Sequence, residues 1–176
     1  MASAPATPLT EEQYLQIERQ AATKSEFHDG QMFAMAGGSP NHSLLASTFG
    51  ALLYQQIPPG CRVFNAGLRI KVVSAGLYTY ADCSVVCGEL QFAGDRQDGV
   101  LNPLLIVEVL SPSTEGYDRG KKFELYRTIG SLREYLIVHQ DRRHVEHYSR
   151  QGAVVVARLG VRIPLADLYA SALDLG

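Results

Sequence analysis

Glu108 is a single acidic residue within a run of seven residues, LLIVEVL, whose other members are all Leu, Ile or Val. Pro103 precedes the run and Ser111-Pro112 follow it, which predicts a short strand that is buried on both faces. An ionised carboxylate in such a strand costs free energy unless a cation or hydrogen-bond donors compensate for it. Glu108 is therefore the first residue of a candidate site.

Asp82 is a second isolated acid, in the apolar segment YTYADCSVVC at residues 78–87. Interpreted as one strand, this segment puts Asp82 on the same face as Ser84 and Val86. If this strand pairs with that of Glu108, the two carboxylates meet at one edge and repel each other unless one is protonated or a cation lies between them. Ligands that are all oxygen favour Mg²⁺ or Mn²⁺, with water and a backbone carbonyl completing the octahedron.

Lys122 supplies a positive counterpart from the next segment. Residues 113–130 predict a helix, and a period of 3.6 residues places Lys122 on its inward face with Asp118 and Tyr126. Lys121 lies about 100 degrees away and is expected to be exposed. Two acids and an inward lysine around a divalent cation suit phosphodiester cleavage, because the metal lowers the pKa of a bound water while the lysine orients that water and offsets phosphate charge.

Each of these residues also has a purely structural interpretation. A lone acid in an apolar strand can pair with a buried Arg or Lys. Lys122 can simply bridge to Asp118 at the i, i+4 spacing that is common on helices. A buried salt-bridge network with no site is therefore one alternative that the sequence leaves open.

Histidine and cysteine spacings predict no further metal site. The histidines of the late hairpin match no metal motif and are interpreted as solvated or partly buried strand residues. The cysteines form no CxxC pair, and their odd number rules out a complete set of disulfides, so we predict buried reduced thiols. These two groups are His139, His144 and His147, and Cys61, Cys83 and Cys87.

Length and composition fit one globular domain. With 176 residues, of which 46% are hydrophobic and 19% charged, we expect a single domain over residues 10–176 after a flexible lead at 1–9. The net charge of −2 gives no general basic signature, so a nucleic acid would have to bind a local patch such as residues 115–150, which hold 8 of the 16 Lys and Arg. The start of the chain lacks the features of a secretory signal, and no apolar run reaches roughly 18 residues, so we expect a cytoplasmic protein that does not bind membranes.

The elements that must position the three candidate residues follow from local patterns. Thr10 and Gln13 have capping-box spacing and predict a short first helix, and Asp29-Gly30 predicts a tight hairpin. A second helix is expected over residues 42–57, capped by Asn41, and strands follow it in CRVFNAGLRIKVV, YTYADCSVVC, LLIVEVL, REYLIV, HVEHYSR and AVVVARL, with a short turn or helix at VRIPLADLY. This order predicts an α/β class (α+β mixed), with a mixed sheet and helices packed on it.

Six segments between residues 25 and 138 follow a family pattern in order, and the resemblance as a whole covers about residues 10–150. They are SEFHDGQM, SPNHS, YADCSVV, LLIVEVLSPST, YDRGKKFELY and LREYLIV. They resemble the motifs of the Uma-type "putative restriction endonucleases", a bacterial group in the PD-(D/E)XK nuclease superfamily. The most specific part is the run E-V-L-S-P-S-T followed by D-x-x-x-K-x-x-x-Y. The resemblance implies a restriction-endonuclease-like mixed central sheet flanked by helices, with an N-terminal helix and hairpin.

The resemblance also implies roles for individual residues. Asp82 and Glu108 become the metal-binding acids, the Val109 carbonyl a further ligand and Lys122 the catalytic lysine. Glu26 takes the place of the family's early acid, either on the metal or just behind its ligands. The residues that would line the pocket are His42 and Tyr126.

Two positions depart from the wider pattern. Ala81 stands where the family usually has proline before the aspartate, which changes the stiffness of the strand but not the ligand. Most of the superfamily has its lysine two residues after the glutamate, where this chain has Leu110. The role of Lys122 therefore depends on its reaching back from the helix.

These expectations combine into a functional prediction. The chain is expected to be an endonuclease that depends on Mg²⁺ or Mn²⁺ and hydrolyses DNA by in-line attack of a metal-activated water. Cutting both strands of a duplex with one site per chain favours a symmetric homodimer. The alternative is a catalytically inactive module that keeps the nuclease fold and binds nucleic acid or a protein without cleavage.

Overall fold

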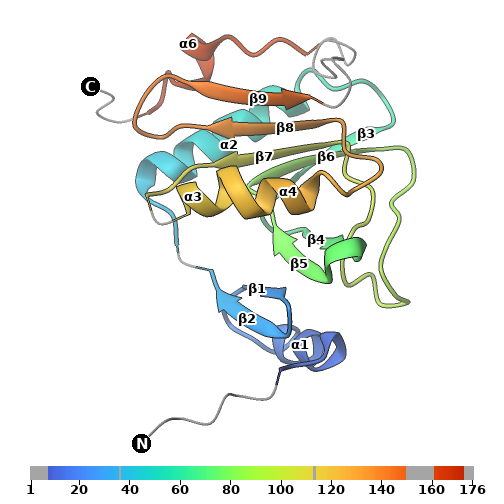
Figure 1. Ribbon diagram of the computed structural model, residues 1–176. Helices are drawn as coiled ribbons and strands as arrows, with labels where there is room; N and C mark the ends of the chain where they lie inside the picture. Colours follow the sequence, from blue (N-terminus) through green and yellow to red (C-terminus); the bar gives the residue numbers. More distant parts are fainter. Residues whose placement is uncertain (1–7, 36, 113, 150–160, 173–176) are drawn as a thin grey trace, which may run out of the picture.

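Two β-sheets form the framework of the protein (Figure 1). The computed structural model describes residues 8–35, 37–112, 114–149 and 161–172. One sheet has five strands in the order β3-β6-β7-β8-β9, and the other has four in the order β2-β1-β5-β4. The strands are β1 (Ser25–His28), β2 (Gln31–Ala34), β3 (Cys61–Asn65), β4 (Arg69–Val72), β5 (Leu77–Tyr80), β6 (Cys83–Cys87), β7 (Leu105–Val109), β8 (Glu134–Val138) and β9 (Val145–Ser149).

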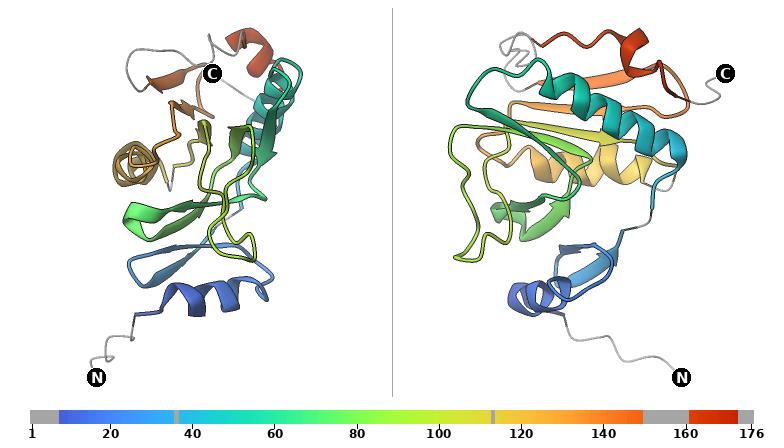
Figure 2. Two further views of the ribbon diagram at one scale, coloured as in Figure 1. Left: turned by 90° about the vertical axis from the view of Figure 1, so that its right-hand side faces the viewer. Right: turned by 180° about the vertical axis from the view of Figure 1, so that it is seen from behind.

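The five-stranded sheet is mixed and carries helices on both faces. β7 and β8 are parallel, and the other neighbours are antiparallel. Helix α2 (Pro40–Tyr54) covers one face, and the segment from α3 (Glu115–Tyr117) to α4 (Phe123–Tyr126) covers the other (Figure 2). The expected class, a mixed sheet flanked by helices with an N-terminal helix and hairpin, is confirmed, while its division into two sheets was not foreseen.

A core layer lies on each side of the five-stranded sheet. Leu45, Phe49 and Leu53 of α2 pack on alternate residues of β6 and β7, as the helical periodicity predicts. On the other side Ile106 and Leu110 pack with Tyr126 of α4. Glu108 lies between Ile106 and Leu110 in the strand alternation, so its carboxylate faces α4 rather than α2.

The four-stranded sheet and α1 (Glu11–Glu18) form a smaller layer beside the first sheet. Thr10 and Gln13 make the predicted capping box. Asp29 and Gly30 both have positive φ, 56° and 78°, as the tight turn between β1 and β2 requires. Aromatic side chains of α1, β1 and β5 pack against one another in this layer. In this layer, Glu26 on β1 lies within reach of Lys122, which packs on the five-stranded sheet.

Residues 78–87 are two strands rather than the predicted one. The chain leaves β5 at Tyr80 and enters β6 at Cys83, and these two strands belong to different sheets. Asp82 therefore lies at the break, not within a strand. The prediction was wrong because both strands are buried on both faces, and alternation of residue types does not mark where a chain of this kind changes sheets.

The segment after β7 is helical but not regular. Between α3 and α4 the backbone forms a π-helical turn, η2 (Asp118–Lys122), and α4 ends at Tyr126, short of the predicted end at Gly130. Lys122 is buried and Lys121 exposed, as expected. Helix α2 also begins earlier than predicted, because Ser39 rather than Asn41 caps it and Pro40 takes the first helical position.

The cysteines correct a further prediction. Cys61 and Cys87 are directly opposed in the register of β3 and β6 and form a disulfide, whereas only Cys83 is a buried free thiol. The spacing of 26 residues gives no hint of a pairing that only the strand register creates.

The end of the described chain is short and irregular. The predicted strand at residues 153–159 lies outside the described residues, and α6 (Leu165–Leu168) follows the gap. None of the helices among the described residues has the length and apolar character needed to cross a membrane.

Candidate active site

The ammonium group of Lys122 lies at the centre of a buried acidic cluster. Its Nζ is 3.0 Å from Glu108 Oε1, 3.1 Å from Glu26 Oε1 and 3.6 Å from Asp118 Oδ1. The Lys122 side chain is 5% exposed, and no acid of this group exceeds 11%. The acids come from β1, β7 and η2, so three elements that are distant in sequence converge on one amine.

Hydrogen bonds fix the two strand-borne acids. The Tyr126 hydroxyl donates to Glu108 Oε1 at 2.9 Å, and the Thr79 hydroxyl donates to Glu26 Oε1. Tyr126 is fully buried, and Tyr135 packs against its ring edge-on. The carboxylate of Glu108 is therefore held in place by its neighbours as well as by its strand.

Asp82 forms a second group immediately beside the first. Its Oδ2 accepts a hydrogen bond of 2.8 Å from the Val109 amide and lies 3.2 Å from His42 Nε2. The hydrogen bond with Asp82 is the largest influence on the His42 side chain and raises its pKa. The backbone of Val109 adds to the rise of this pKa. Ser39 caps the first turn of α2 through the His42 amide, and this positions the imidazole.

Burial and the neighbouring charges shift the pKa values of the groups in this cluster. Burial raises the pKa of Glu108 to about 8, Asp118 and Asp82 add to the rise, and Lys122 opposes it. Burial also raises the pKa of Asp118. Burial by itself would lower the pKa of Lys122, but the surrounding acids outweigh it and hold that pKa well above its ordinary value. The amine is therefore a cation, and the carboxylates still lack compensation.

The oxygen donors of this cluster are of the kind that a divalent cation binds. Glu26, Glu108 and Asp118 surround the single ammonium group and Asp82 lies beside His42, so the acids of the cluster outnumber its cations. Asp82 and Glu108 offer hard oxygen ligands from adjoining chain segments, and the Val109 carbonyl belongs to the residue after Glu108. Mg²⁺ and Mn²⁺ prefer oxygen donors of this kind. The four acids are Glu26, Asp82, Glu108 and Asp118.

The residues that the sequence singled out lie together, with one qualification. Lys122 forms ion pairs with Glu108 and Glu26 but not with Asp82, which pairs with His42 instead. In the described part of the chain no arginine forms an ion pair with Asp82 or Glu108. Leu110 is buried in the apolar core, so the position two residues after Glu108 carries no charge, and Lys122 approaches from η2 instead.

Two members of the cluster were not recognised from the sequence. Asp118 was considered only as a helical partner of Lys122, and Thr79 was not considered. The i, i+4 spacing of Asp118 and Lys122 was the one available signal for the first. Nothing local distinguishes Thr79, since its role arises only because β5 lies beside β1 and Glu26.

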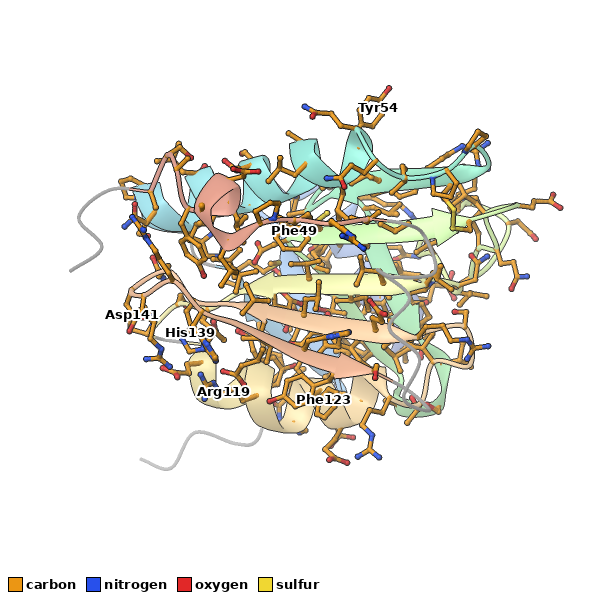
Figure 3. The ribbon with its side chains drawn as sticks, turned by 90° about the horizontal axis from the view of Figure 1, so that it is seen from above. Phe49, Tyr54, Arg119, Phe123, His139 and Asp141 are labelled. Carbon is orange, nitrogen blue, oxygen red and sulfur yellow. A yellow bond between two sulfur atoms is a disulfide. The ribbon has the colours of Figure 1, made fainter. Side chains whose placement is uncertain are left out.

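A second cluster of potential metal ligands lies at the β8–β9 turn. One ligand atom each of His139, His144 and Glu146 lie within 4.8 Å of one another. The Arg119 guanidinium contacts two of them, 2.5 Å from Glu146 Oε1 and 2.9 Å from His139 Nε2, and Figure 3 shows Arg119 and His139 at the same end of the sheet. A cationic side chain thus already compensates this group. His139 is buried rather than solvated, which the sequence did not indicate.

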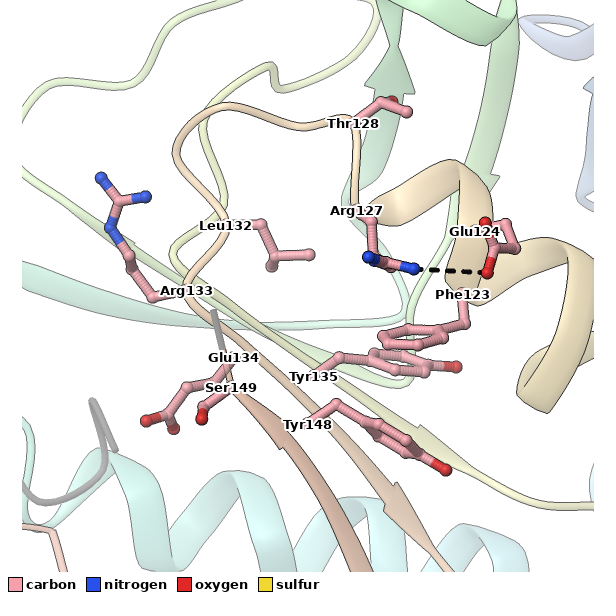
Figure 4. Close-up of a pocket in the computed structure, with 10 residues that line it drawn as sticks. All are labelled: Phe123, Glu124, Arg127, Thr128, Leu132, Arg133, Glu134, Tyr135, Tyr148 and Ser149. Atoms are coloured by element: carbon pink, nitrogen blue, oxygen red, sulfur yellow. Dashed lines mark hydrogen bonds and ion pairs between the residues drawn. The ribbon is translucent and has the colours of Figure 1, made fainter. Parts of the chain in front are cut away.

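A pocket beside α4 lies apart from the acidic cluster. It has a volume of about 470 Å³ and lies between α4 and the strands β8 and β9, beside the rings of Phe123 and Tyr148 (Figure 4). Arg127 and Glu124 on its rim pair with each other at 3.4 Å. None of the four clustered acids lines this pocket. We therefore assign the chemistry to the acidic cluster rather than to this pocket.

Comparisons with known proteins show the family of the chain. Residues 11–173 match the model of the Uma2 family, which is described as "Putative restriction endonuclease". Two uncharacterized proteins of Synechocystis sp. (strain ATCC 27184 / PCC 6803 / Kazusa) are similar in sequence. The protein slr1290 is 40% identical over 151 residues, which are 84% of this chain and 77% of that protein. The protein sll1609 is 42% identical over 147 residues, which are 82% of each.

A solved structure has the same fold. It is described as "a putative nuclease belonging to DUF820" from Anabaena variabilis ATCC 29413. The TM-score is 0.72 at 17% sequence identity, and the match covers 94% of this chain and 100% of the other. At this identity the likeness concerns the fold alone.

Proposed function

Because the chain belongs to the Uma2 family, described as "Putative restriction endonuclease", we propose that it is a metal-dependent nuclease of the PD-(D/E)XK type that hydrolyses phosphodiester bonds in DNA. The observation that carries this proposal is the 3.0 Å contact of Lys122 with Glu108, beside an Asp82 that bonds to the next residue of the same strand. Acid, acid and lysine thus lie together without the lysine that the superfamily usually has on that strand.

In this proposal, Asp82, Glu108 and the Val109 carbonyl hold Mg²⁺ or Mn²⁺. Bound there, the cation would lower the pKa of a coordinated water and polarise the phosphate. The excess of carboxylates supports such a site, because burial raises the pKa of Glu108, Asp118 and Asp82 add to the rise, and a divalent cation would compensate the buried charge. Glu26 would lie behind the ligands and hold Lys122.

The protein groups have separate tasks in this mechanism. Lys122 offsets charge on the phosphate and orients the attacking water. Tyr126 holds the Glu108 carboxylate by donating to its Oε1, while His42 fixes the orientation of Asp82. Asp118 pairs with Lys122 from one helical turn away and keeps the amine charged.

A plasmid-nicking assay tests this function. Supercoiled DNA is incubated with the protein in Mg²⁺, in Mn²⁺ and in chelator. We expect nicking with either metal, none with chelator, and none for Asp82→Asn or Lys122→Gln, while Lys121→Gln keeps the activity because Lys121 is exposed. A wild-type protein that nicks equally well in chelator, or a fully active Lys122→Gln variant, would refute the mechanism.

Binding without cleavage is the second candidate function. The observation in its favour is that Lys122 already has three carboxylate partners and is 5% exposed, as in a purely structural network. It predicts that DNA is retained in a filter or gel-shift assay with and without metal, and that no metal produces nicks.

Two earlier expectations belong to this proposal. A homodimer would present two sites to a duplex, and light scattering of the purified protein measures this directly. A cytoplasmic location would place the protein where DNA is accessible, and fractionation of cells that express it tests this.

A further inference from the structure

A groove runs along the side of α2 and ends at the candidate site. It has a volume of about 430 Å³, within the range of small-molecule pockets. One wall is a helical face of α2 and the other is the edge strand β3. The residues that line it include Ser47, Gly50, Tyr54, Gln55, Asn65 and Asp82. Asp82 thus belongs both to the groove and to the acidic cluster.

The charge of the groove restricts what it can hold. Asp82 is its one charged member, and no lysine or arginine occurs among the described residues that line it. A surface that follows the phosphates of a duplex relies on lysine and arginine. This groove therefore suits an uncharged part of a nucleic acid, namely a base and its sugar.

The side chains of the groove are those that bind unpaired bases. Tyr54 is 74% exposed and points away from α2 into solvent, in contrast to Phe49, which points toward the sheet (Figure 3). An exposed ring of this kind can stack on a base of any sequence. Ser47, Gln55 and Asn65 add groups that can hydrogen bond to base edges, and the absence of a side chain at Gly50 keeps the floor open.

We propose that this groove holds an unpaired nucleotide of the strand being cut, next to the phosphate at Asp82, so that the protein acts on single-stranded or locally unpaired DNA. This proposal depends on the nuclease function proposed above. The geometry behind it is the continuity between the uncharged groove and Asp82. A base inside a duplex reaches such a groove only after it has been unpaired and rotated out of the stack.

Two substitutions in the groove test the proposal. Gly50→Leu adds a side chain to the lining of the groove. A Cβ at this position meets only Cys83 Sγ, at 4.0 Å, and leucine favours helix more than glycine does; circular dichroism checks that the variant is folded. Tyr54→Ala removes the stacking surface. Phe33→Ala is the matched control, since Phe33 is an aromatic residue 49% exposed on β2, outside the groove.

Binding and cleavage are measured separately. Fluorescence anisotropy in chelator uses a labelled single-stranded oligonucleotide and a duplex of the same sequence, and cleavage of both is followed in Mn²⁺. We expect tighter binding and faster cleavage of the single strand, and about tenfold weaker binding of it by Gly50→Leu and by Tyr54→Ala but not by Phe33→Ala. Thermal stabilisation by Mn²⁺ should be unchanged in both groove variants, because the metal ligands remain.

The outcomes separate the two proposals. A duplex preference, or groove variants that bind and cut like wild type, overturns the inference and leaves the nuclease function standing. If no metal supports cleavage of either DNA, the nuclease function fails. The binding measurements alone then test whether the groove holds an unpaired nucleotide. Absence of binding to the single strand overturns the inference as well.

Discussion

Lys122 is the residue on which the acidic cluster depends most. It faces three carboxylates from three elements, so its removal would leave several buried acids without a cation. We predict that Lys122→Met lowers the free energy of unfolding at neutral pH by about 3 to 5 kcal/mol, the usual effect of stranding a buried charge. Urea denaturation measures this value. Lys121→Met, at the exposed neighbouring position, should change it by less than about 0.5 kcal/mol. Equal stability of the two variants would show that the cluster is not an interacting network.

Glu108 gives the cluster a definite pH dependence. Its pKa is about 8 in the folded protein and near 4.5 in the unfolded chain, so folding takes up a proton between these values. The contribution of Glu108 to stability is thus complete below about pH 4.5 and is lost as the pH rises through about 8. We predict that, in chelator, wild type loses more stability than Glu108→Gln between about pH 5 and about pH 8. Parallel pH profiles for the two proteins would contradict this.

Residue chemistry made most of the candidate site predictable. An isolated acid in an apolar run, as at Glu108, costs so much free energy that its presence in the sequence is informative by itself. Asp118 and Thr79 gave no such signal, because an acid or a threonine in an amphipathic segment is ordinary. Their place in the cluster depends on contacts between elements that are distant in the chain.

At the scale of elements, prediction succeeded where the local signal was strong. The capping box of α1 and the Asp29-Gly30 turn each depend on residues that are close in sequence, and both predictions are confirmed. The sequence of residues 78–87 predicts one strand, because an apolar run contains no residue pattern that would indicate the break at Asp82 or the change of sheet. The π-turn η2 was missed for a similar reason, since five polar or small residues fit a regular helix equally well.

The link between β3 and β6 gives a prediction at the same scale. The Cys61–Cys87 disulfide closes a loop of 26 residues, for which the chain-entropy relation gives about 3.5 kcal/mol. We predict that Cys61→Ser combined with Cys87→Ser lowers stability by roughly this amount, whereas addition of a reductant does not change the stability of the double variant. Alkylation of the denatured, non-reduced protein should label Cys83 alone, and three labelled cysteines would show that the bond is absent.

At the scale of the whole molecule, the cluster lies where the two sheets meet. The four-stranded sheet contributes Glu26, and the five-stranded sheet with its helices contributes Glu108 and Lys122, so the site exists only when both parts are folded together. Mixed α+β composition was readable from the order of elements, but the arrangement of two sheets was not, because it depends on which strands pair at long range.

This arrangement predicts that a divalent metal stabilises the whole fold. A ligand that binds only the folded chain at 100 times its Kd adds about 2.7 kcal/mol to the free energy of unfolding. We expect Mn²⁺ to raise the Tm of wild type and to leave that of Asp82→Asn unchanged. Differential scanning fluorimetry over a metal series provides the measurement. Equal shifts in both proteins would place the metal elsewhere.

The central claim is that Asp82, Glu108 and the Val109 carbonyl hold one divalent cation beside Lys122. Anomalous diffraction from crystals soaked in Mn²⁺ tests it most directly. We predict a single strong peak at about 2.0–2.3 Å from an oxygen of each of these three groups. A peak at His139, His144 and Glu146 instead, or no peak near Asp82 and Glu108, would contradict it.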